Sequence, residues 1–458
     1  MPSPLAEAAG VADEARRDAL QRALEIVRRE ELHTILVSMC DGSGTSRVKS
    51  FPAVQLERLA GIGVPYQSGV LSLDSGADFV SGTGFDFELR GGCFLLLPDP
   101  STLVPTPWSP GTGVVMGDAY FEDGRPVEAT PRHTARRLLT ALDARGLEMS
   151  SGWEFEFYTF RRDSSGELVS TTPDGQALHQ VRHRQVEPML DTLRRELAGA
   201  GVEIVDAIHE YGPGQLEINF PPDRGLAAID RAFFFRLAVK EILAREGIVA
   251  TFMTKPLQGR AASACHIHQA LYDRAGANVF ADEADPDGIS ELCRRWMGGQ
   301  CVHADSLTAL TTPTVNGYKR YAPNSFAPLV ASWGLENRTT MLRVPLDRGE
   351  NTRVESRLPE AATIPYVAAA GIIATSLLGL DEPTAAERYR AGNAYESELP
   401  RLPESLARAI DALEADTAVA NVLGAEFLRL YIALKRNEIR RFEASISDWE
   451  RNEYLELS

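Results

Sequence analysis

"WEFEFYTF", residues 153–160, is the stretch that decides the fold. In it, Glu154 and Glu156 alternate with the aromatic residues Phe155 and Phe157. Successive side chains of a β-strand point to opposite faces of the sheet. The pattern therefore predicts a strand with both carboxylates on one face and large apolar side chains on the other. The same alternation also fits an amphipathic strand whose acidic face is solvated.

Two further segments show acidic or histidine side chains in strand-like patterns. "HEYGPGQLEINF", residues 209–220, places Glu210 and Glu217 on either side of Gly-Pro-Gly, which can turn the chain back and bring the two carboxylates together. An ordinary exposed hairpin would show the same pattern. In "CHIHQALYD", His266 and His268 stand two positions apart, so a strand directs both to one face, where a metal or an anionic ligand would explain them.

A third segment, "NTRVESRLP", carries charges at alternate positions. Arg353, Glu355 and Arg357 share one face of a strand, with the carboxylate between two guanidinium groups. A surface ladder of salt bridges is the alternative interpretation. What favours a functional site is that similar acidic patterns recur on several strand-like segments.

Taken together, these segments predict a site for divalent cations. Carboxylates gathered in one place repel one another unless cations neutralise them. Ligation by many oxygens and a single imidazole suits Mg²⁺ or Mn²⁺ better than zinc. Arginines beside such metals suit phosphoryl transfer, whose transition state spreads negative charge over several oxygens. We therefore expect a dinuclear magnesium site and a nucleoside triphosphate, held without a G-x-x-x-x-G-K-[ST] loop, which the sequence lacks.

Length and composition limit the other possibilities. A chain of 458 residues that is 44% hydrophobic can bury a large core and suggests two or more domains. The net charge of −17 repels a polyphosphate backbone, which argues against nucleic acid. Five cysteines without metal-ligand spacing favour reduced thiols. No apolar stretch is long enough for a membrane span, and the first 30 residues form a charged helical pattern, so we expect a cytoplasmic protein without a membrane partner.

The pattern along the chain indicates a mixed, α+β fold. Helical spacing alternates with strand-like and proline-rich or glycine-rich segments, and a domain boundary fits near residue 110. We expect a helix over 13–31, strands over 33–40 and from 95, a surface loop over 72–86, helices over 131–146 and 186–198, and a mostly helical stretch over the last 55 residues.

The ordered motifs resemble those of the glutamine synthetase family, of the bacterial type. The matching stretches follow one another in the family's order: "LLLPDPSTLVPTPW", "WEFEFYTF", "HEYGPGQLEINF", "FMTKPL", "HIHQALYD", "PTVNGYKRYAP", "ENRTTMLRVP", "RVESRLPEAATIPY" and "LKRNEIRRFEASISDWERNEYL". The resemblance implies an N-terminal β-grasp domain, residues 1–109, and a larger catalytic α/β domain with an antiparallel sheet, residues 110–458. It also implies a homo-dodecamer of two hexameric rings, with active sites between neighbouring subunits.

The resemblance also implies roles for individual residues. The family's ligands of the metal that organises the amino-acid substrate correspond to Glu156, Glu210 and Glu217. Its ligands of the metal that bridges the ATP phosphates correspond to Glu154, His266 and Glu355. Two or three Mg²⁺ or Mn²⁺ ions are implied. His268 corresponds to a histidine that contacts the substrate, and Arg320 and Arg357 correspond to the residues that orient the glutamate carboxylates. The arginines around the phosphates correspond to Arg338, Arg343 and Arg353, of which Arg338 is a catalytic residue.

The implied reaction uses ATP to phosphorylate the side-chain carboxylate of glutamate. An amine then attacks the acyl phosphate to give a γ-glutamyl amide and phosphate. Orientation and neutralisation of charge would carry the catalysis.

Departures from the family pattern bear on the substrates. Phe326 in "YAPNSFAP" stands where ammonia-using members place a flap glutamate, and an aromatic ring can line a pocket for the carbon chain of a larger amine. Asp41 corresponds to an acid supplied by a neighbouring subunit, although an Asp-Gly turn is the alternative. Ala262 and Ala264 replace residues of a glycine-rich loop beside glutamate. Tyr395 lies near the family's adenylylation site, but the spacing differs and we predict no such regulation.

Several functions remain open at this point. We favour a ligase that joins glutamate to an alkyl or aryl amine, ethanolamine or a polyamine. The alternatives are an ammonia-using glutamine synthetase and a catalytically silent structural or regulatory member. A guanidino kinase with a related catalytic domain is disfavoured by the N-terminal domain and the C-terminal helix.

Overall fold

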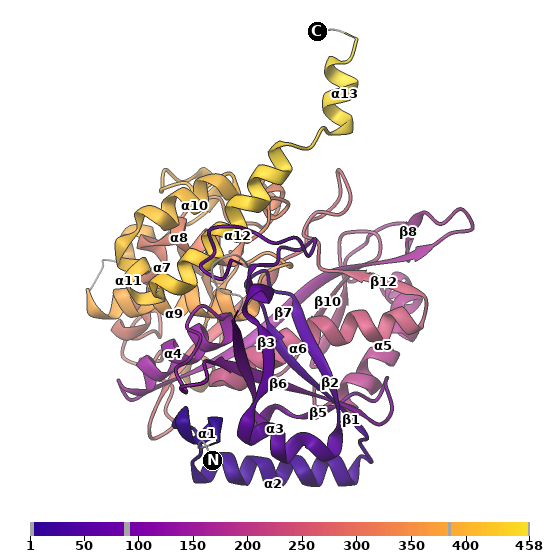
Figure 1. The fold of residues 1–458 in the computed structure, drawn as a ribbon. Coiled ribbons are helices and arrows are strands. Elements are labelled where there is room, and N and C mark those ends of the chain that lie inside the picture. The colour runs from indigo at the N-terminus through magenta and orange to yellow at the C-terminus, as the bar shows by residue number, and fades with distance from the viewer. Residues whose placement is uncertain (1–3, 87–91, 383–385, 457–458) are drawn as a thin grey trace.

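The computed structural model describes residues 4–86, 92–382 and 386–456. Two β-sheets form its framework, and most of the helices lie with the larger sheet (Figure 1). The mixed arrangement of helices and strands confirms the expected α+β composition.

The smaller sheet has the strand order β2-β1-β6-β4-β3, with β5 beside β6. β1 runs parallel to β6, and the other neighbours are antiparallel. The predicted helix over 13–31 and the strand over 33–40 are confirmed. The elements are α1 (Leu5–Ala8), α2 (Glu14–Arg29), β1 (Thr34–Cys40), β2 (Ser46–Pro52), α3 (Leu56–Ile62), β3 (Val64–Gln67), β4 (Cys93–Pro98), β5 (Val104–Pro105) and β6 (Thr112–Tyr120).

The smaller sheet continues past residue 109, where we predicted the domain boundary. β6 pairs with both β1 and β4, and Val127 and Ala129 pack into the same apolar core as these strands. The division into two domains stays a prediction, and this pairing argues for a boundary after β6.

The larger sheet has the order β14-β15-β16-β13-β7-β10-β9, and β7 also pairs with β8, β11 and β12. The strand predicted around "WEFEFYTF" is therefore the centre of the sheet. The strands are β7 (Leu147–Arg162), β8 (Leu168–Ser170), β9 (Asp206–His209), β10 (Gln215–Asn219), β11 (Asp223–Arg224), β12 (Ile248–Thr251), β13 (Cys265–Asp273), β14 (Trp333–Leu335), β15 (Leu342–Val344) and β16 (Val354–Ser356).

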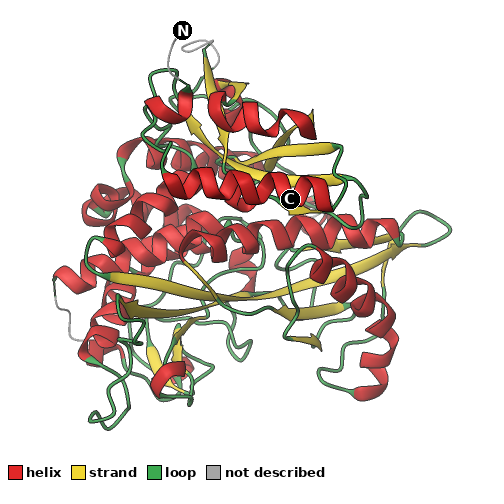
Figure 2. Ribbon diagram, turned by 90° about the horizontal axis from the view of Figure 1, so that it is seen from below, coloured by secondary structure: helices red, strands yellow, loops and turns green. Residues whose placement is uncertain are grey.

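Helices cover one side of the long central strand (Figure 2). Phe155 on β7 stacks on Phe235 of α6 with ring centroids 5.4 Å apart, and both rings are fully buried. The aromatic face of β7 is thus the core face, as its alternation predicts. The helices of this part are α4 (Pro131–Asp143), α5 (Gln180–Gly199), α6 (Gly225–Arg245), α7 (Glu291–Val302), α8 (Ala304–Thr311), α9 (Pro365–Asp381), α10 (Leu406–Ala415), α11 (Thr417–Leu423), α12 (Ala425–Glu443) and α13 (Asp448–Tyr454).

α5 begins at Gln180, earlier than the predicted residue 186, because its first turns are polar and its buried apolar positions start only at Val186. The helical C-terminal region is confirmed, and α13 projects away from the body (Figure 1). Among the described residues no single helix is long and apolar enough to cross a membrane, although α11 and the helical segment after it meet the length and composition together with a bend of 112°.

Candidate active site

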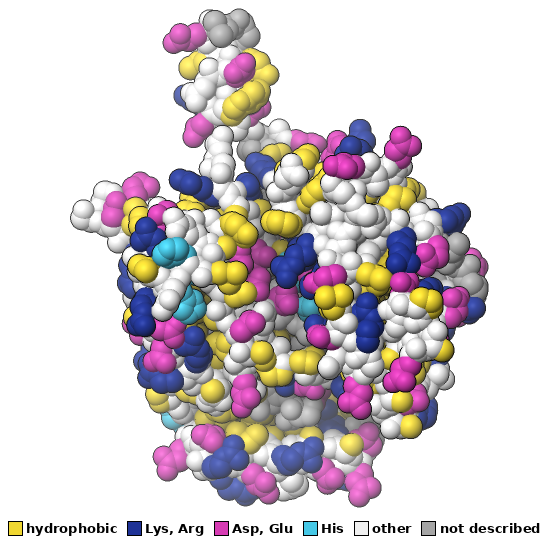
Figure 3. Space-filling model, turned by 180° about the vertical axis from the view of Figure 1, so that it is seen from behind, with side chains coloured by type: hydrophobic (Ala, Val, Ile, Leu, Met, Phe, Trp, Pro, Cys, Tyr) yellow, Lys and Arg dark blue, Asp and Glu magenta, His cyan; other side chains and the backbone are white. Residues whose placement is uncertain are grey.

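The register of the larger sheet brings the predicted ligands together. Glu217 on β10 lies opposite Glu156 on β7. Glu154 lies opposite His266 on β13. Since side chains at i and i+2 of a strand share a face, the carboxylates and imidazoles gather on the side of the sheet away from α6. In the space-filling view, acidic side chains gather at a hollow near the middle of one face, with basic side chains beside them (Figure 3).

Glu154 is the residue that both histidines contact. His268 Nε2 lies 2.7 Å from Glu154 Oε1, and His266 Nδ1 lies 3.2 Å from Glu154 Oε2. His266 Nδ1 is also 3.6 Å from Oε1 of Glu355. Two overlapping groups have ligand atoms within 4.8 Å of one another: Glu154, His268 and Glu355, and Glu154, Glu217 and His266. The second group is made up of predicted metal ligands only.

The donor set fits hard divalent cations. Carboxylate oxygens dominate, and the imidazole can serve as a neutral ligand because burial, followed by the charge of Arg357, lowers the pKa of His266 to about 4. Zinc, which favours closed tetrahedral sites with nitrogen and sulfur ligands, fits this oxygen-rich set less well. The residues therefore suit Mg²⁺ or Mn²⁺.

The acids on the Glu217 side need a neutralising charge. Burial and then the neighbouring Glu210 raise the pKa of Glu156 to about 8. Burial and then Glu156 raise the pKa of Glu217 to about 9, and burial also raises the pKa of Glu210. Glu217 is only 9% exposed, so water screens this repulsion poorly. Divalent cations would remove the repulsion and allow all three carboxylates to ionise at neutral pH.

Glu154 and Glu355 have the opposite electrostatic balance. Burial opposes their ionisation, but hydrogen bonds from His266 and His268 hold the pKa of Glu154 well below its usual range. The charge of Arg357, and then of His266, brings the pKa of Glu355 to about 2. These two carboxylates are therefore ionised throughout the physiological range.

Two arginines bind the carboxylate of Glu355, a residue that is only 1% exposed. Arg343 Nη1 donates to Glu355 Oε2 at 2.6 Å, and Arg357 Nη1 donates to Glu355 Oε1 at 2.5 Å. Arg343 also donates through Nη2 to Glu336 Oε1 at 2.6 Å. Arg320 donates to the backbone carbonyls of Arg357 and Leu358 at 2.8 and 3.1 Å. The structure thus brings Arg320, Arg343 and Arg357 to the edge of the carboxylate cluster.

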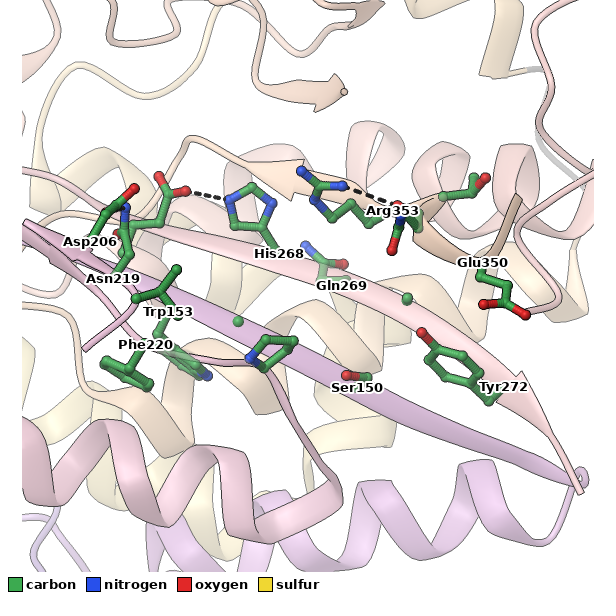
Figure 4. Close-up of a pocket in the computed structure, with 17 residues that line it drawn as sticks. Ser150, Trp153, Asp206, Asn219, Phe220, His268, Gln269, Tyr272, Glu350 and Arg353 are labelled. Carbon is green, nitrogen blue, oxygen red and sulfur yellow. Dashed lines mark hydrogen bonds and ion pairs between the residues drawn. The ribbon is translucent and has the colours of Figure 1, made fainter. Parts of the chain in front are cut away.

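A pocket of about 370 Å³ opens beside the cluster (Figure 4). Glu154, His268 and Arg353 line it together with apolar and aromatic side chains, among them Trp153 and Tyr272. The Arg353 guanidinium is held by the carbonyl of Asn351 at 3.1 Å and by Asp347 at 3.2 Å. A cavity that combines apolar walls, an arginine and cation ligands at one end can hold a nucleotide.

Three predicted residues lie outside these contacts. Asp41 is fully buried in the β1–β2 turn, where Oδ1 accepts from the Ser43 and Thr45 amides at 2.9 Å and Oδ2 accepts from Arg47. This is the turn role that the sequence left as the alternative, and within the described part of one chain Asp41 makes no hydrogen bond or ion pair with the carboxylate cluster. Arg338 makes no hydrogen bond among the described residues, although its charge lowers the pKa of Glu210, which burial raises overall.

Phe326 lies on the flap, residues 322–328, and is 50% exposed. Its carbonyl accepts from Arg357 Nη2 at 3.3 Å. The flap is therefore hydrogen-bonded to the same arginine that binds Glu355, and the half-exposed phenyl ring can contact a ligand.

Sequence reasoning missed several residues that support the site. Gln215 Nε2 donates to Glu156 Oε2 at 3.2 Å and to the Ala262 carbonyl at 3.1 Å, and Asn219 Nδ2 donates to Glu217 Oε1 at 3.2 Å. Their positions two residues before and after Glu217 on one strand face were an available signal.

The sequence around Glu360 and Glu336, which also support the site, shows no pattern of this kind. Glu360 is fully buried, accepts from Thr254 and Thr314 hydroxyls at 2.5 and 2.9 Å, and has a pKa raised by burial to about 7. Its donors come from two loops distant in the sequence, so no local pattern could reveal it.

Comparisons with known proteins agree on one family. The model of the glutamine synthetase catalytic domain matches residues 128–454. A γ-glutamylethanolamide synthetase, GlnA4 of Streptomyces coelicolor, is 34% identical over 97% of each chain, and a glutamate–isopropylamine ligase of a Pseudomonas species is 30% identical over 97% of this chain and 99% of its own. Other relatives with 29–35% identity are named glutamine synthetase. The solved structure "Apo GmaS without ligand" superposes with a TM-score of 0.83 at 30% identity, covering 94% of this chain and 98% of that one.

Proposed function

Because the chain belongs to the glutamine synthetase family and is a ligase of that type, we propose that it joins the γ-carboxylate of glutamate to an organic amine at the expense of ATP. The observation that carries the choice of amine is Phe326. The aromatic ring is half exposed on a flap tied to Arg357, at the position where the family resemblance implies a glutamate for ammonium.

The residues of this chain divide the chemical tasks among them. Arg320 donates to the Arg357 carbonyl at 2.8 Å, and the charges of both arginines favour ionisation of Glu156; in this proposal they orient the carboxylates of glutamate. Arg343 and Arg353, at the cluster and in the adjoining pocket, are placed to hold phosphate oxygens, and Arg338 is the candidate to stabilise charge on the transferred phosphoryl group.

Bound Mg²⁺ or Mn²⁺ would neutralise the phosphates and the carboxylates of Glu154, Glu156, Glu210, Glu217 and Glu355. The glutamate γ-oxygen then attacks the γ-phosphorus of ATP, the bond to ADP breaks, and an acyl phosphate forms. The amine nitrogen next attacks the acyl carbon, inorganic phosphate leaves, and the nitrogen loses a proton.

Phe326 favours an amine that has a carbon chain. A phenyl ring cannot accept a proton or pair with ammonium as a carboxylate can, but it offers an apolar surface to alkyl groups and a π-face to a cation. The relatives named for ethanolamide and isopropylamine chemistry support this choice. The second candidate function is an ordinary glutamine synthetase, which the relatives of that name favour.

Several further properties belong to this proposal. The family resemblance supports a homo-dodecamer of two hexameric rings, in which Asp41 of one copy would serve the site of another. It also supports an N-terminal β-grasp domain, with the two-domain boundary moved to follow β6. Substrates such as ATP and glutamate support a cytoplasmic location.

Phosphate release with glutamate, ATP and Mg²⁺ tests the proposal directly. The amine panel is ammonia, isopropylamine, ethanolamine, benzylamine and putrescine. We expect an organic amine to give a higher kcat/KM than ammonia, with the γ-glutamyl amide identified by mass. Ammonia as the best nucleophile would support the second candidate. No release with any amine would indicate a silent family member.

A further inference from the structure

Tyr395 connects a distant loop to the flap. It lies in the short helix η7 (Ala394–Glu396), and its hydroxyl donates to the Ala327 carbonyl at 3.1 Å. Arg357 donates to the preceding carbonyl, that of Phe326, at 3.3 Å. Two side chains from different parts of the chain therefore hold two consecutive flap carbonyls.

The flap needs such support because its backbone is strained. Asn324 has φ of 60° and Phe326 has φ of 58°, in the left-handed region that costs energy for residues with a Cβ. The Phe326 ring is 50% exposed, so its own packing does not fix it. The Ser325 hydroxyl contacts the Arg320 and Ala322 carbonyls at 3.2 and 2.6 Å and accepts from the Ala327 amide at 3.3 Å. All three contacts lie within residues 320–327, so they shape the flap without joining it to a distant part of the chain.

The loop that carries Tyr395 is itself anchored near the candidate site. The Ala394 amide donates to Thr339 Oγ1 at 2.9 Å, and Asn337 Nδ2 donates to the Ala391 carbonyl at 3.1 Å. Thr339 and Asn337 flank Arg338. The loop that carries Tyr395 is thus anchored to the segment around Arg338, proposed to act on the phosphoryl group, and the Tyr395 hydroxyl reaches the flap, proposed to border the amine.

We propose that Tyr395 is a positioning residue whose hydroxyl, by holding the Ala327 carbonyl, places Phe326 and so sets the selectivity for the amine. This inference rests on the proposed function, because it takes the flap to border the amine. Losing the hydroxyl leaves the Ala327 carbonyl without this donor and lets the flap leave its strained conformation. The nucleophile should then be bound less well, whereas ATP, bound elsewhere, should be unaffected.

The test is Tyr395→Phe, with Tyr389→Phe as the matched control. Tyr389 ends the neighbouring short helix η6 (Ala386–Tyr389), and its hydroxyl makes no hydrogen bond within the described residues. We expect Tyr395→Phe to raise the KM of the best amine roughly three- to tenfold, a change of the size that one hydrogen bond supplies. The KM of ATP and the thermal midpoint should stay at the wild-type values, as should all parameters of the control.

A double-mutant cycle with Phe326→Ala separates positioning from a general structural effect. If Tyr395 acts through the flap ring, its loss should change the preference between the best amine and ammonia in the wild-type background and hardly at all once the ring is absent. Equal effects in both backgrounds, or an unchanged amine KM in Tyr395→Phe, would overturn the inference.

Failure of the proposed function would look different. In that case the wild-type enzyme itself prefers ammonia, and the KM of ammonia becomes the quantity compared between Tyr395→Phe and Tyr389→Phe. A raised KM for ammonia in Tyr395→Phe alone would still support the positioning role, and equal values would still reject it.

Discussion

Glu355 on β16 lies directly opposite His268 on β13 in the register of the larger sheet. The Glu355 carboxylate is shared between Arg343 and Arg357, while His268 contacts Glu154. His266 Nδ1 lies 3.6 Å from the Glu355 carboxylate, so this buried acid links an imidazole to the two arginines, and a change at this position should disturb both.

Glu355→Gln should lower turnover by about 100-fold or more, because the amide keeps the shape but removes the charge that holds a cation and two guanidinium groups. Phosphate release at saturating ATP and glutamate measures this. Glu404→Gln, an exposed residue of the C-terminal region, is the control. Turnover within twofold of wild type in Glu355→Gln would contradict the role of Glu355 as a ligand.

Glu217→Gln should stabilise the protein in the presence of EDTA while abolishing activity. A carboxyl group whose pKa is raised on folding, here to about 9, destabilises the folded state at every pH above its unfolded pKa. Its replacement should therefore raise the free energy of unfolding by about 1–3 kcal/mol near pH 8 and have no effect below about pH 4. Thermal unfolding at both pH values checks this against Glu203→Gln, and equal midpoints at pH 8 would count against the repulsion.

Divalent cations should stabilise the wild-type protein through the histidine and carboxylate cluster. A ligand at 100 times its Kd stabilises the folded state by about 2.7 kcal/mol, so Mn²⁺ should raise the thermal midpoint measurably. His266→Ala should weaken Mn²⁺ binding by about tenfold to 100-fold and reduce this rise. His179→Ala, which alters an exposed residue outside the cluster, should respond as wild type does. The same Mn²⁺ response in His266→Ala would place the cation elsewhere.

Phe326→Glu should raise the use of ammonia relative to larger amines, because a carboxylate on the flap can pair with ammonium and accept its proton. Phe326→Gln removes the ring without supplying a charge and serves as the control. The measurement is the ratio of kcat/KM for ammonia to that for the best amine. An unchanged ranking of amines in Phe326→Glu would show that residue 326 does not border the nucleophile.

The fold should lose stability in acid through a second charged cluster, in which Arg132 contacts Asp99, Asp118 and Asp230 at 2.6–3.0 Å. Burial opposes ionisation of Asp118, but Arg132 and then Arg136 hold its pKa below the usual range. A depressed folded pKa contributes stability above the unfolded pKa of about 3.9, and this contribution disappears as the pH falls through the folded value.

Asp118→Asn should therefore be less stable than wild type at pH 7, and the difference should shrink below about pH 4. Urea unfolding at pH 7 and pH 3.5 measures the free energy of unfolding at each pH. Asp18→Asn, exposed on α2, is the control. A difference that stays constant with pH would show that Asp118 acts through packing rather than charge.

Local patterns predicted what lies within one strand or helix. The alternation in "WEFEFYTF" placed Phe155 in the core and Glu154 on the opposite face, and the Gly-Pro-Gly turn paired β9 with β10. The strands β2, β3 and β5 were not predicted, because β2 is polar and mostly exposed, and β3 and β5 are short and contain proline.

The convergence of the site could be inferred from the family resemblance but not from local sequence. Glu217, Glu154, His266 and Glu355 come from strands adjacent only through long-range pairing. Glu360 and Tyr395 matter through contacts with loops more than 40 residues away, which no periodicity encodes. Asp41 shows the reverse case, since its local role in a turn was visible in the sequence, whereas the role proposed for it toward another subunit depends on a second chain.

The aromatic side of β7 packs on α6 in the core, whereas residues 322–326 of the flap are exposed, and the Phe326 and Ala327 carbonyls bind Arg357 and Tyr395. The groups proposed to activate the glutamate carboxylate are thus held rigid by core packing, whereas the flap proposed to border the amine is not. Replacements confined to residues 322–328 and 394–396 should accordingly change the preferred nucleophile and leave the proposed activation of glutamate intact.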